Sequence, residues 1–330
     1  MIMASNPYNA TGTYQPDKTI GPPQLYAWPP RPLGALRYLF YDLLFPWGYF
    51  FIGLAFVTWY YLTPPLATMA VFEPGWIALL WLRNAALLTL VVGGLHWWLY
   101  VHRGQHKEYK FDDKWPATGN PKFLWGHQVR DNMFWSIASG VTFWTAYEAV
   151  TYWIYANGYV SNPAFVDHPA YLGLMLIAVF FWSTLHFYFV HRFMHYQPVY
   201  KVVHELHHRN INTIPWTGIS MHPLEHSIYF SVFLLWWFVP VHPVVIVLTG
   251  LFQGIGPAPS HSGFDFIKLR GGFKISTGDW YHQLHHQYFN FNYGNTTTPF
   301  DRLFGSWHDG SSDSLRAQKE RKRMQRRKAA

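Results

Sequence analysis

Long apolar blocks recur along this chain and constrain its fold more than any other feature. A helix that crosses a lipid bilayer needs about 20 mainly apolar residues. Four segments meet this requirement, namely residues 36–62, 76–101, 132–155 and 171–190. Only 13% of the residues are charged, whereas a share of about 25% is usual. The sequence therefore predicts an all-α integral membrane protein with a bundle of four transmembrane helices.

A fifth apolar block, from residue 226 to residue 256, contains Pro240 and Pro243. A proline inside a helix removes a backbone hydrogen bond and clashes with the preceding turn. Two prolines this close together therefore predict a break. We interpret the block as a membrane-embedded hairpin of two short helices, 227–238 and 244–252. Such a hairpin returns the chain to the side from which it entered, which a single crossing would not.

Basic residues are distributed unevenly among the predicted loops. Cytoplasmic loops carry an excess of Lys and Arg. Loops 63–75 and 158–169 contain neither residue type. Loop 102–131 contains six, namely Arg103, Lys107, Lys110, Lys114, Lys122 and Arg130. We therefore expect both termini, this loop and a histidine-rich helical cap after the fourth helix on the cytoplasmic side.

These patterns divide the chain into four regions. We expect a flexible N-terminal segment (1–35), the N-terminal transmembrane helices (36–170), a histidine-rich domain (171–310) and a basic tail (311–330). The tail reads RAQKERKRMQRRK over residues 316–328, in a chain of net charge +8. Anionic lipid headgroups attract such segments. A nucleic-acid partner is not expected, because no basic stretch accompanies a motif that reads bases.

The chain has 19 histidines and no cysteine. Disulfides, thiolate metal sites and cysteine nucleophiles are therefore excluded. Eight histidines form three motifs in which residues three and four apart share a helix face. The motifs are HRFMH (His191, His195), HELHH (His204, His207, His208) and HQLHH (His282, His285, His286). Further candidates are His222 and His226 in MHPLEH and His261 in HSGFD.

Eight imidazoles in a repeated register indicate a metal site. Imidazole suits zinc, copper, iron and nickel. One zinc needs about three or four ligands, so this set suits two ions. One alternative is a membrane zinc hydrolase, because His204, Glu205 and His208 also form a His-Glu-x-x-His motif. Another is a histidine-rich metal transport or sensor protein.

The order of the three histidine motifs after hydrophobic spans resembles the fatty acid hydroxylase / sterol desaturase superfamily. HPLE (222–225), HSGFD (261–265) and NTTTPFDRLFGSW (295–307) also resemble its signatures. The resemblance covers residues 171–307. It implies a non-haem centre of two iron ions that uses O2 and two electrons to hydroxylate or desaturate a lipid, such as a sterol or a fatty acyl chain.

The resemblance also implies the metal ligands. They are His191, His195, His204, His207, His208, His261, His282, His285 and His286, with His222 and His226 as less secure candidates. Glu205 and Glu225 are candidate catalytic carboxylates that accept a ligand N–H and so tune the metal. No glycine fingerprint for a nucleotide is present, so we expect electrons from an external cytochrome or ferredoxin. The identity of the lipid stays open.

Overall fold

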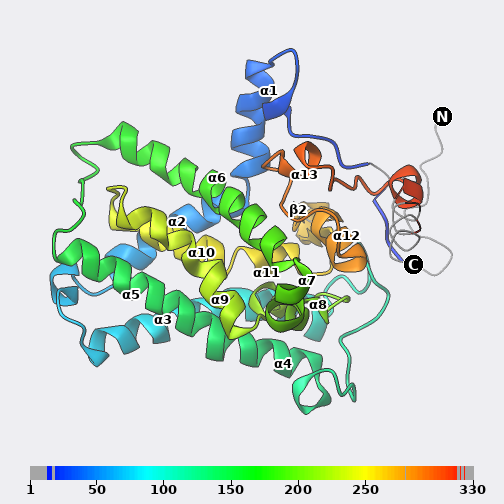
Figure 1. Cartoon of the computed structure of the whole chain (residues 1–330), viewed down its shortest axis with the longest axis horizontal. Helices are drawn as coiled ribbons and strands as arrows, with labels where there is room; N and C mark the ends of the chain where they lie inside the picture. The colour runs from blue at the N-terminus through cyan, green and yellow to red at the C-terminus, as the bar shows by residue number, and fades with distance from the viewer. Residues whose placement is uncertain (1–12, 17–18, 279, 318–319, 321–322, 324–330) are drawn as a thin grey trace.

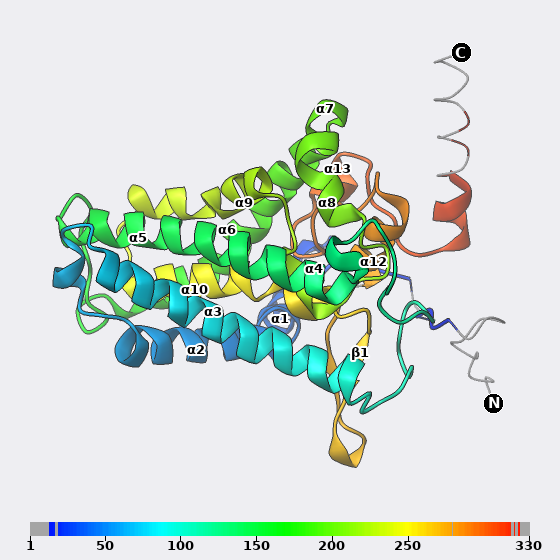
Figure 2. The same cartoon turned by 90° about the horizontal axis from the view of Figure 1, so that it is seen from below.

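The computed structural model describes residues 13–16, 19–278, 280–317, 320 and 323, and these residues are mostly helical. Most of the basic tail therefore lies outside the described residues. Five long helices run side by side along the molecule, and short helices gather at one end (Figures 1 and 2). The long helices are α2 (Trp47–Leu62), α3 (Pro74–His96), α5 (Thr142–Ala156), α6 (Pro169–Met194) and α10 (Pro243–Gly254).

The shorter elements complete the fold. They are α1 (Pro32–Arg37), α4 (Gln128–Phe134), α7 (Gln197–Val199), α8 (Glu205–His208), α9 (Pro223–Tyr229), α11 (Pro257–Ser260), α12 (Trp280–Tyr288) and α13 (Phe300–Leu303). Strands β1 (Phe266–Lys268) and β2 (Lys274–Ser276) pair as an antiparallel hairpin. This hairpin corrects the all-α prediction, which missed it because each strand has only three residues.

Three helical stretches are long and apolar enough to cross a membrane, namely Pro74–Val101, Pro169–Met194 and Pro243–Ser260. The first predicted span, 36–62, is not one straight helix. It breaks into Pro32–Leu43 and Trp47–Leu62, bent by 61°, and Pro46 lies at the break, where its ring cannot continue the helical hydrogen bonds. If this pair is one span, the described residues contain four.

The third predicted span, 132–155, lies within a continuous helical stretch from Gln128 to Ala156, formed by α4, a π-helical segment (Trp135–Val141) and α5. It is not among the stretches that are apolar enough to cross. The reason is its polar inner face. Asn132, Ser136 and Glu148 are buried against neighbouring segments rather than exposed to lipid.

The break predicted near Pro240 and Pro243 is present, and α10 begins at Pro243 after the turn. The two arms run antiparallel. The Tyr229 hydroxyl donates to Gln253 O at one end, and Trp236 Nε1 donates to Thr249 Oγ1 nearer the turn. The returning arm is 78% buried within the protein. It therefore forms the centre of the bundle, where α2, α5 and α6 pack around it.

Loop 102–131 lies at the same end of the molecule as the histidine motifs. Gln128 Nε2 donates to Asn210 Oδ1, two residues after the second motif. Phe111 N donates to Gly263 O, two residues after His261. The basic loop and the histidines therefore share one end of the bundle, as the predicted topology requires. The side of the membrane on which this end lies stays a prediction.

A buried ion pair joins α3 to α5 within the bundle. Arg83 Nη2 lies 2.6 Å from Glu148 Oε1, and Arg83 Nη1 donates to Thr63 Oγ1. The second carboxylate oxygen accepts from Asn84 Nδ2, and the Tyr152 hydroxyl donates to the first. A buried charge is costly unless it is paired and hydrogen-bonded. Here both charged groups have several partners, so the pair holds the two helices in register.

We predict that removing either partner destabilises the fold strongly. Arg83→Met or Glu148→Met leaves the other charge buried and unpaired, which costs about 3 to 5 kcal/mol. The double variant Arg83→Met/Glu148→Met should be more stable than either single variant. The measurement is the free energy of unfolding of purified protein in detergent micelles. Single variants as stable as the parent would contradict this account.

Candidate metal centre

Nine of the predicted ligands converge at one end of the bundle. The end of α6 and the residue after it, the residue before α8 and α8 itself, the residue after α11, and α12 supply them. They form two groups, and within each group the possible ligand atoms lie within 4.8 Å of one another. The first group is His191, His195, His204, His208 and His285, and the second is His207, His261, His282 and His286.

The sequence motifs do not coincide with these groups. HELHH gives His204 and His208 to the first group and His207 to the second. HQLHH gives His285 to the first group and His282 and His286 to the second. Residues four apart share a helix face, and their neighbours point elsewhere. Helices α8 and α12 therefore each contribute to both groups and fix the position of one group relative to the other.

The imidazole nitrogens within each group lie very close together. In the first group, the Nε2 atoms of His195, His208 and His285 form a triangle with sides of 3.1 Å. His191 Nε2 lies 3.0 Å from His204 Nε2. In the second group, His282 Nε2 lies 2.9 Å from His261 Nε2 and 3.2 Å from His286 Nε2. Each group thus gathers its Nε2 atoms around one point.

Backbone carbonyls fix the tautomers of several of these rings. A carbonyl oxygen can only accept a hydrogen bond. His191 Nδ1 lies 2.5 Å from Tyr293 O, His285 Nδ1 lies 2.5 Å from Phe291 O, and His261 Nδ1 lies 2.8 Å from Pro257 O. In each ring the proton is therefore on Nδ1. The Nε2 atoms of these three rings therefore carry lone pairs, and each faces the Nε2 atom of another histidine in its group.

This arrangement fits a bound metal. Two nitrogen ligands about 2.1 Å from one ion lie about 3.0 to 3.4 Å apart for bond angles between 90° and the tetrahedral angle. The Nε2 separations of 2.9 to 3.2 Å match that spacing. Facing lone pairs repel unless a cation lies between them. The nine residues therefore meet both the geometric and the chemical requirement for two metal ions.

Burial keeps these imidazoles neutral, as metal ligands must be. Loss of solvent lowers the pKa of His261 to about 4 and that of His285 to about 3. It lowers the pKa of His207 and His208 well below the ordinary value as well. At neutral pH these groups are therefore unprotonated, and their lone pairs are available.

Glu225 supports the first group from α9. His204 Nδ1 lies 2.6 Å from Glu225 Oε1, and both side chains are buried. Glu225 Oε2 is buried and has no hydrogen-bond partner among the described residues. The carboxylate can therefore orient His204 and still offer one oxygen.

Glu205, the other predicted carboxylate, is exposed at the start of α8, on a different helix face from His204 and His208. We therefore withdraw its catalytic assignment. A helix turns by about 100° per residue, so Glu205 does not share the face of His204, which precedes it.

His222 and His226 lie outside both groups. His222 Nδ1 accepts from Leu224 N and caps α9. His226 is buried, with Nδ1 bonded to Ser139 Oγ and Nε2 bonded to Ile219 O. Both of its nitrogens therefore have protein partners. We therefore remove His222 and His226 from the set of candidate ligands. Both residues are close to Glu225 in sequence, but their rings bond to other groups.

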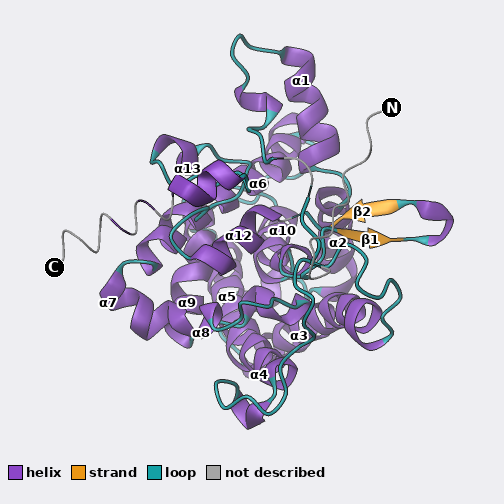
Figure 3. Cartoon of the chain, turned by 90° about the vertical axis from the view of Figure 1, so that its right-hand side faces the viewer, coloured by secondary structure: helices purple, strands orange, loops and turns teal. Residues whose placement is uncertain are grey.

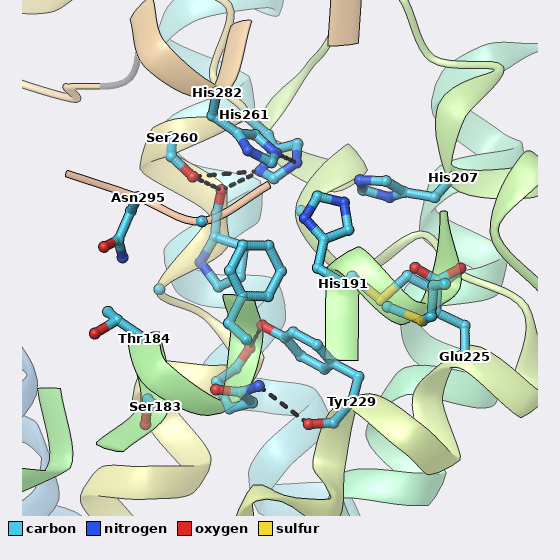
Figure 4. Close-up of a pocket in the computed structure, with 18 of the residues that line it drawn as sticks. Ser183, Thr184, His191, His207, Glu225, Tyr229, Ser260, His261, His282 and Asn295 are labelled. Carbon is cyan, nitrogen blue, oxygen red and sulfur yellow. Dashed lines mark hydrogen bonds between the residues drawn. The ribbon is translucent and has the colours of Figure 1, made fainter. Parts of the chain in front are cut away.

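A cavity of about 110 Å³ adjoins the two groups and extends between α6, α9 and α10. Figure 4 shows His191, His207, His261 and His282 around one part of it and Ser183 and Thr184 in another. Apolar side chains complete much of the wall, namely Phe187, Met194, Met221 and Phe252. A ligand in this cavity is thus enclosed by mainly apolar walls next to the histidines.

Sequence reasoning missed most of the cavity-lining residues. Ser183, Tyr229 and Gln253 come from three separate helices, and no spacing in the sequence links them. Asn295 is different, because it begins the NTTTPFDRLFGSW motif. Asp301 in the same motif accepts from Tyr293 N and Gly294 N. The motif thus holds the backbone that lines the cavity and orients His191.

Comparisons with known proteins agree with this geometry. The family model for fatty acid hydroxylases matches residues 175–306. The Delta(7)-sterol 5(6)-desaturase of Eremothecium gossypii is 31% identical over 144 residues, 42% of this chain and 39% of that protein. The Delta(7)-sterol 5(6)-desaturase ERG3 of Candida albicans is 33% identical over 131 residues, 39% of this chain and 32% of that protein.

Human lathosterol oxidase is 29% identical over 142 residues, 43% of this chain and 47% of that protein. The chain thus spans less than half the length of these relatives. No solved structure matches the chain. All nine histidines of the two groups lie within residues 175–306. The chain therefore carries a fatty acid hydroxylase domain over residues 175–306 and resembles the sterol desaturases and the oxidase over about two fifths of its length.

Proposed function

We propose that this protein is a membrane-bound non-haem diiron oxidase that uses O2 and two electrons to hydroxylate or desaturate a lipid. One observation carries the proposal. Nine histidines, eight of them buried and His195 half-buried, form two groups whose ring nitrogens face one another beside a cavity with mainly apolar walls. Two ions held by neutral nitrogen ligands next to an apolar cavity suit the oxidation of an apolar substrate.

Each group would hold one iron. When bound, the iron pair supplies the reduction of O2 and the oxidising power needed to remove hydrogen from an unactivated C–H bond. Hydroxylation places one oxygen atom in the C–H bond and reduces the other to water. Desaturation removes two hydrogens and leaves both oxygen atoms as water. Either reaction consumes two electrons and two protons, and we propose an external cytochrome or ferredoxin as the electron donor.

The protein's own residues position the ligands and exclude water. Backbone carbonyls orient the rings of His191, His285 and His261. Each carbonyl accepts a hydrogen bond from the Nδ1–H of its ring, so that Nε2 points inward. Glu225 does the same for His204 with a carboxylate, which makes the ring more basic. Phe187 and Phe252 enclose the cavity from α6 and α10.

The substrate class is inferred from the relatives. Their printed names are sterol desaturases and a lathosterol oxidase, and a sterol or a fatty acyl chain suits a cavity with apolar walls. A zinc hydrolase built on His204, Glu205 and His208 is not favoured. Its general base would be Glu205, which is exposed, and it would leave the second histidine group without a role.

A deletion strain tests the activity directly. We predict that a precursor lipid accumulates in this strain and that its product is missing. The product is heavier than the precursor by about 16 Da if the protein adds oxygen, or lighter by about 2 Da if it removes two hydrogens. The measurement is comparative lipidomics of the deletion strain, with and without the restored gene. Lipid profiles that do not differ would contradict the proposed function.

Metal analysis tests the two groups separately. We predict about two irons per chain in protein purified without added metal, because the eight motif histidines and His261 suit two ions. His285→Ala removes a ligand of the first group, and His207→Ala removes a ligand of the second. Each variant should therefore contain less iron than the parent. Both should abolish turnover, because a diiron centre acts as a unit.

Two matched controls accompany these variants. His168→Ala, in the loop before α6, and His226→Gln, outside both groups, should keep the iron content of the parent. One zinc per chain with full activity would exclude the diiron proposal. Iron loss in His168→Ala would mean that the division between ligands and other histidines is wrong.

Glu225 offers a separate test of how His204 is oriented. Glu225→Gln keeps an oxygen that can accept from His204 Nδ1 but replaces the carboxyl group with an amide, whereas Glu225→Ala removes the acceptor altogether. We predict that Glu225→Ala lowers iron affinity or turnover by about 10- to 100-fold and that Glu225→Gln lowers it less. Iron titration and turnover of both variants check this order. Equal losses in the two variants would exclude the hydrogen bond as the cause.

A further inference from the structure

The hairpin of β1 and β2 projects sideways from the bundle (Figure 3). Its turn contains Gly271 and Gly272, both with positive φ, a conformation that glycine adopts readily. All residues from 268 to 274 are exposed. Among them, Leu269 is 40% and Phe273 is 55% exposed. The tip therefore presents two large apolar side chains that the rest of the described chain does not cover.

The base of the hairpin is fixed rigidly. Gln105 Nε2 donates to Phe266 O, and Lys268 N donates to Gln105 Oε1. Lys268 also forms an ion pair of 2.9 Å with Glu108. The hairpin is thus anchored to the 102–131 loop, and its projecting direction is a fixed feature of the fold.

The hairpin is also bonded to the beginning of α2. Trp47 Nε1 donates to Ser276 O over 2.8 Å. Trp47 is the first residue of α2, directly after the 61° bend that separates α2 from Pro32–Leu43, and tryptophan is enriched where spans enter the lipid–water interface. The hairpin therefore leaves the protein near the level at which α2 enters the membrane.

A second apolar element leaves the bundle beside the same point. The segment Pro32–Leu43 is bent by 61° from α2, and it projects away from the long helices (Figure 1). Leu33, Leu36 and Tyr41 are exposed on it. Two projecting elements with exposed apolar residues on either side of Trp47 are expected where a protein contacts the surface of a bilayer.

The charge of the hairpin identifies the surface that suits it. Residues 266–276 read FIKLRGGFKIS, with three basic residues and no acidic one. Lys268 is paired with Glu108, whereas Arg270 is exposed at the turn. Exposed apolar residues beside such a cation suit a bilayer surface, because the apolar groups enter the boundary region and the cation meets anionic headgroups.

We propose that the hairpin Phe266–Ser276 is an interfacial anchor that inserts Leu269 and Phe273 into an anionic lipid surface. This contact is separate from substrate binding and does not depend on the proposed function. It has a structural consequence, because the hairpin connects His261 to His282, whose Nε2 atoms lie 2.9 Å apart in the second histidine group. The lipid surface would thus hold the segment that joins these two residues.

Site-specific labelling tests the anchor. The chain has no cysteine, so Leu269→Cys and Phe273→Cys each create a unique site for an environment-sensitive fluorophore. The full protein is reconstituted in vesicles of phosphatidylcholine, with or without phosphatidylserine, that contain nitroxide-bearing lipids. Leu90→Cys on the exposed face of α3 serves as the bilayer control, and Asp313→Cys, with an 88% exposed side chain, serves as the aqueous control.

We expect lipid nitroxides to quench the labels at 269 and 273 at least about threefold more than the label at 313, as for other apolar groups at the bilayer boundary. Quenching should be stronger with phosphatidylserine, and Arg270→Glu should reduce that increase. Labels that respond only to a water-soluble quencher would overturn the anchor, and so would labels shielded from both quenchers. Equal quenching in neutral and anionic vesicles would overturn the preference for anionic lipid.

Discussion

The convergence of unprotonated imidazole nitrogens is the constraint on which the rest of this structure depends. Backbone carbonyls and Glu225 bind the Nδ1 sides of His191, His285 and His204. The Nε2 lone pairs of His191 and His204 then face one another across about 3 Å. Such a set is unfavourable without a cation between the lone pairs. Burial strengthens the requirement, because it lowers the pKa of rings such as His261 and His285 and removes protonation as an alternative.

The helical bundle provides the rigid frame for this set. Helix α10 is almost entirely covered by protein, and the side chains of Tyr229 and Trp236 join it to the arm that precedes it. The Arg83–Glu148 pair joins α3 to α5 with every charge hydrogen-bonded. Unsatisfied polar groups are most costly away from water. The polar residues inside the bundle therefore specify how its helices pack.

The cavity relates this frame to the proposed chemistry. Helix α6 carries Ser183 and Phe187 along its wall and His191 at its end, so one helix links the lipid-facing bundle to the first histidine group. Gly294 and Asn295 line the cavity from a separate segment, whose backbone is held by Asp301 and whose Tyr293 carbonyl orients His191. A ligand in this cavity would therefore contact side chains supplied by several separate segments.

The sequence by itself indicated the helical membrane character, the break near Pro240 and the eight histidines of the three motifs, because apolar length, proline and helical spacing are local properties. Only the tertiary structure divided HELHH and HQLHH between two groups, separated Glu225 from Glu205 and excluded His226, since these outcomes depend on which face each helix turns toward its neighbours. The cavity wall likewise arises from contacts between residues far apart in the chain, whereas the bend at Pro46 and the β-hairpin are local features that the apolar pattern did not reveal. Periodicity within a segment carries no information about such contacts.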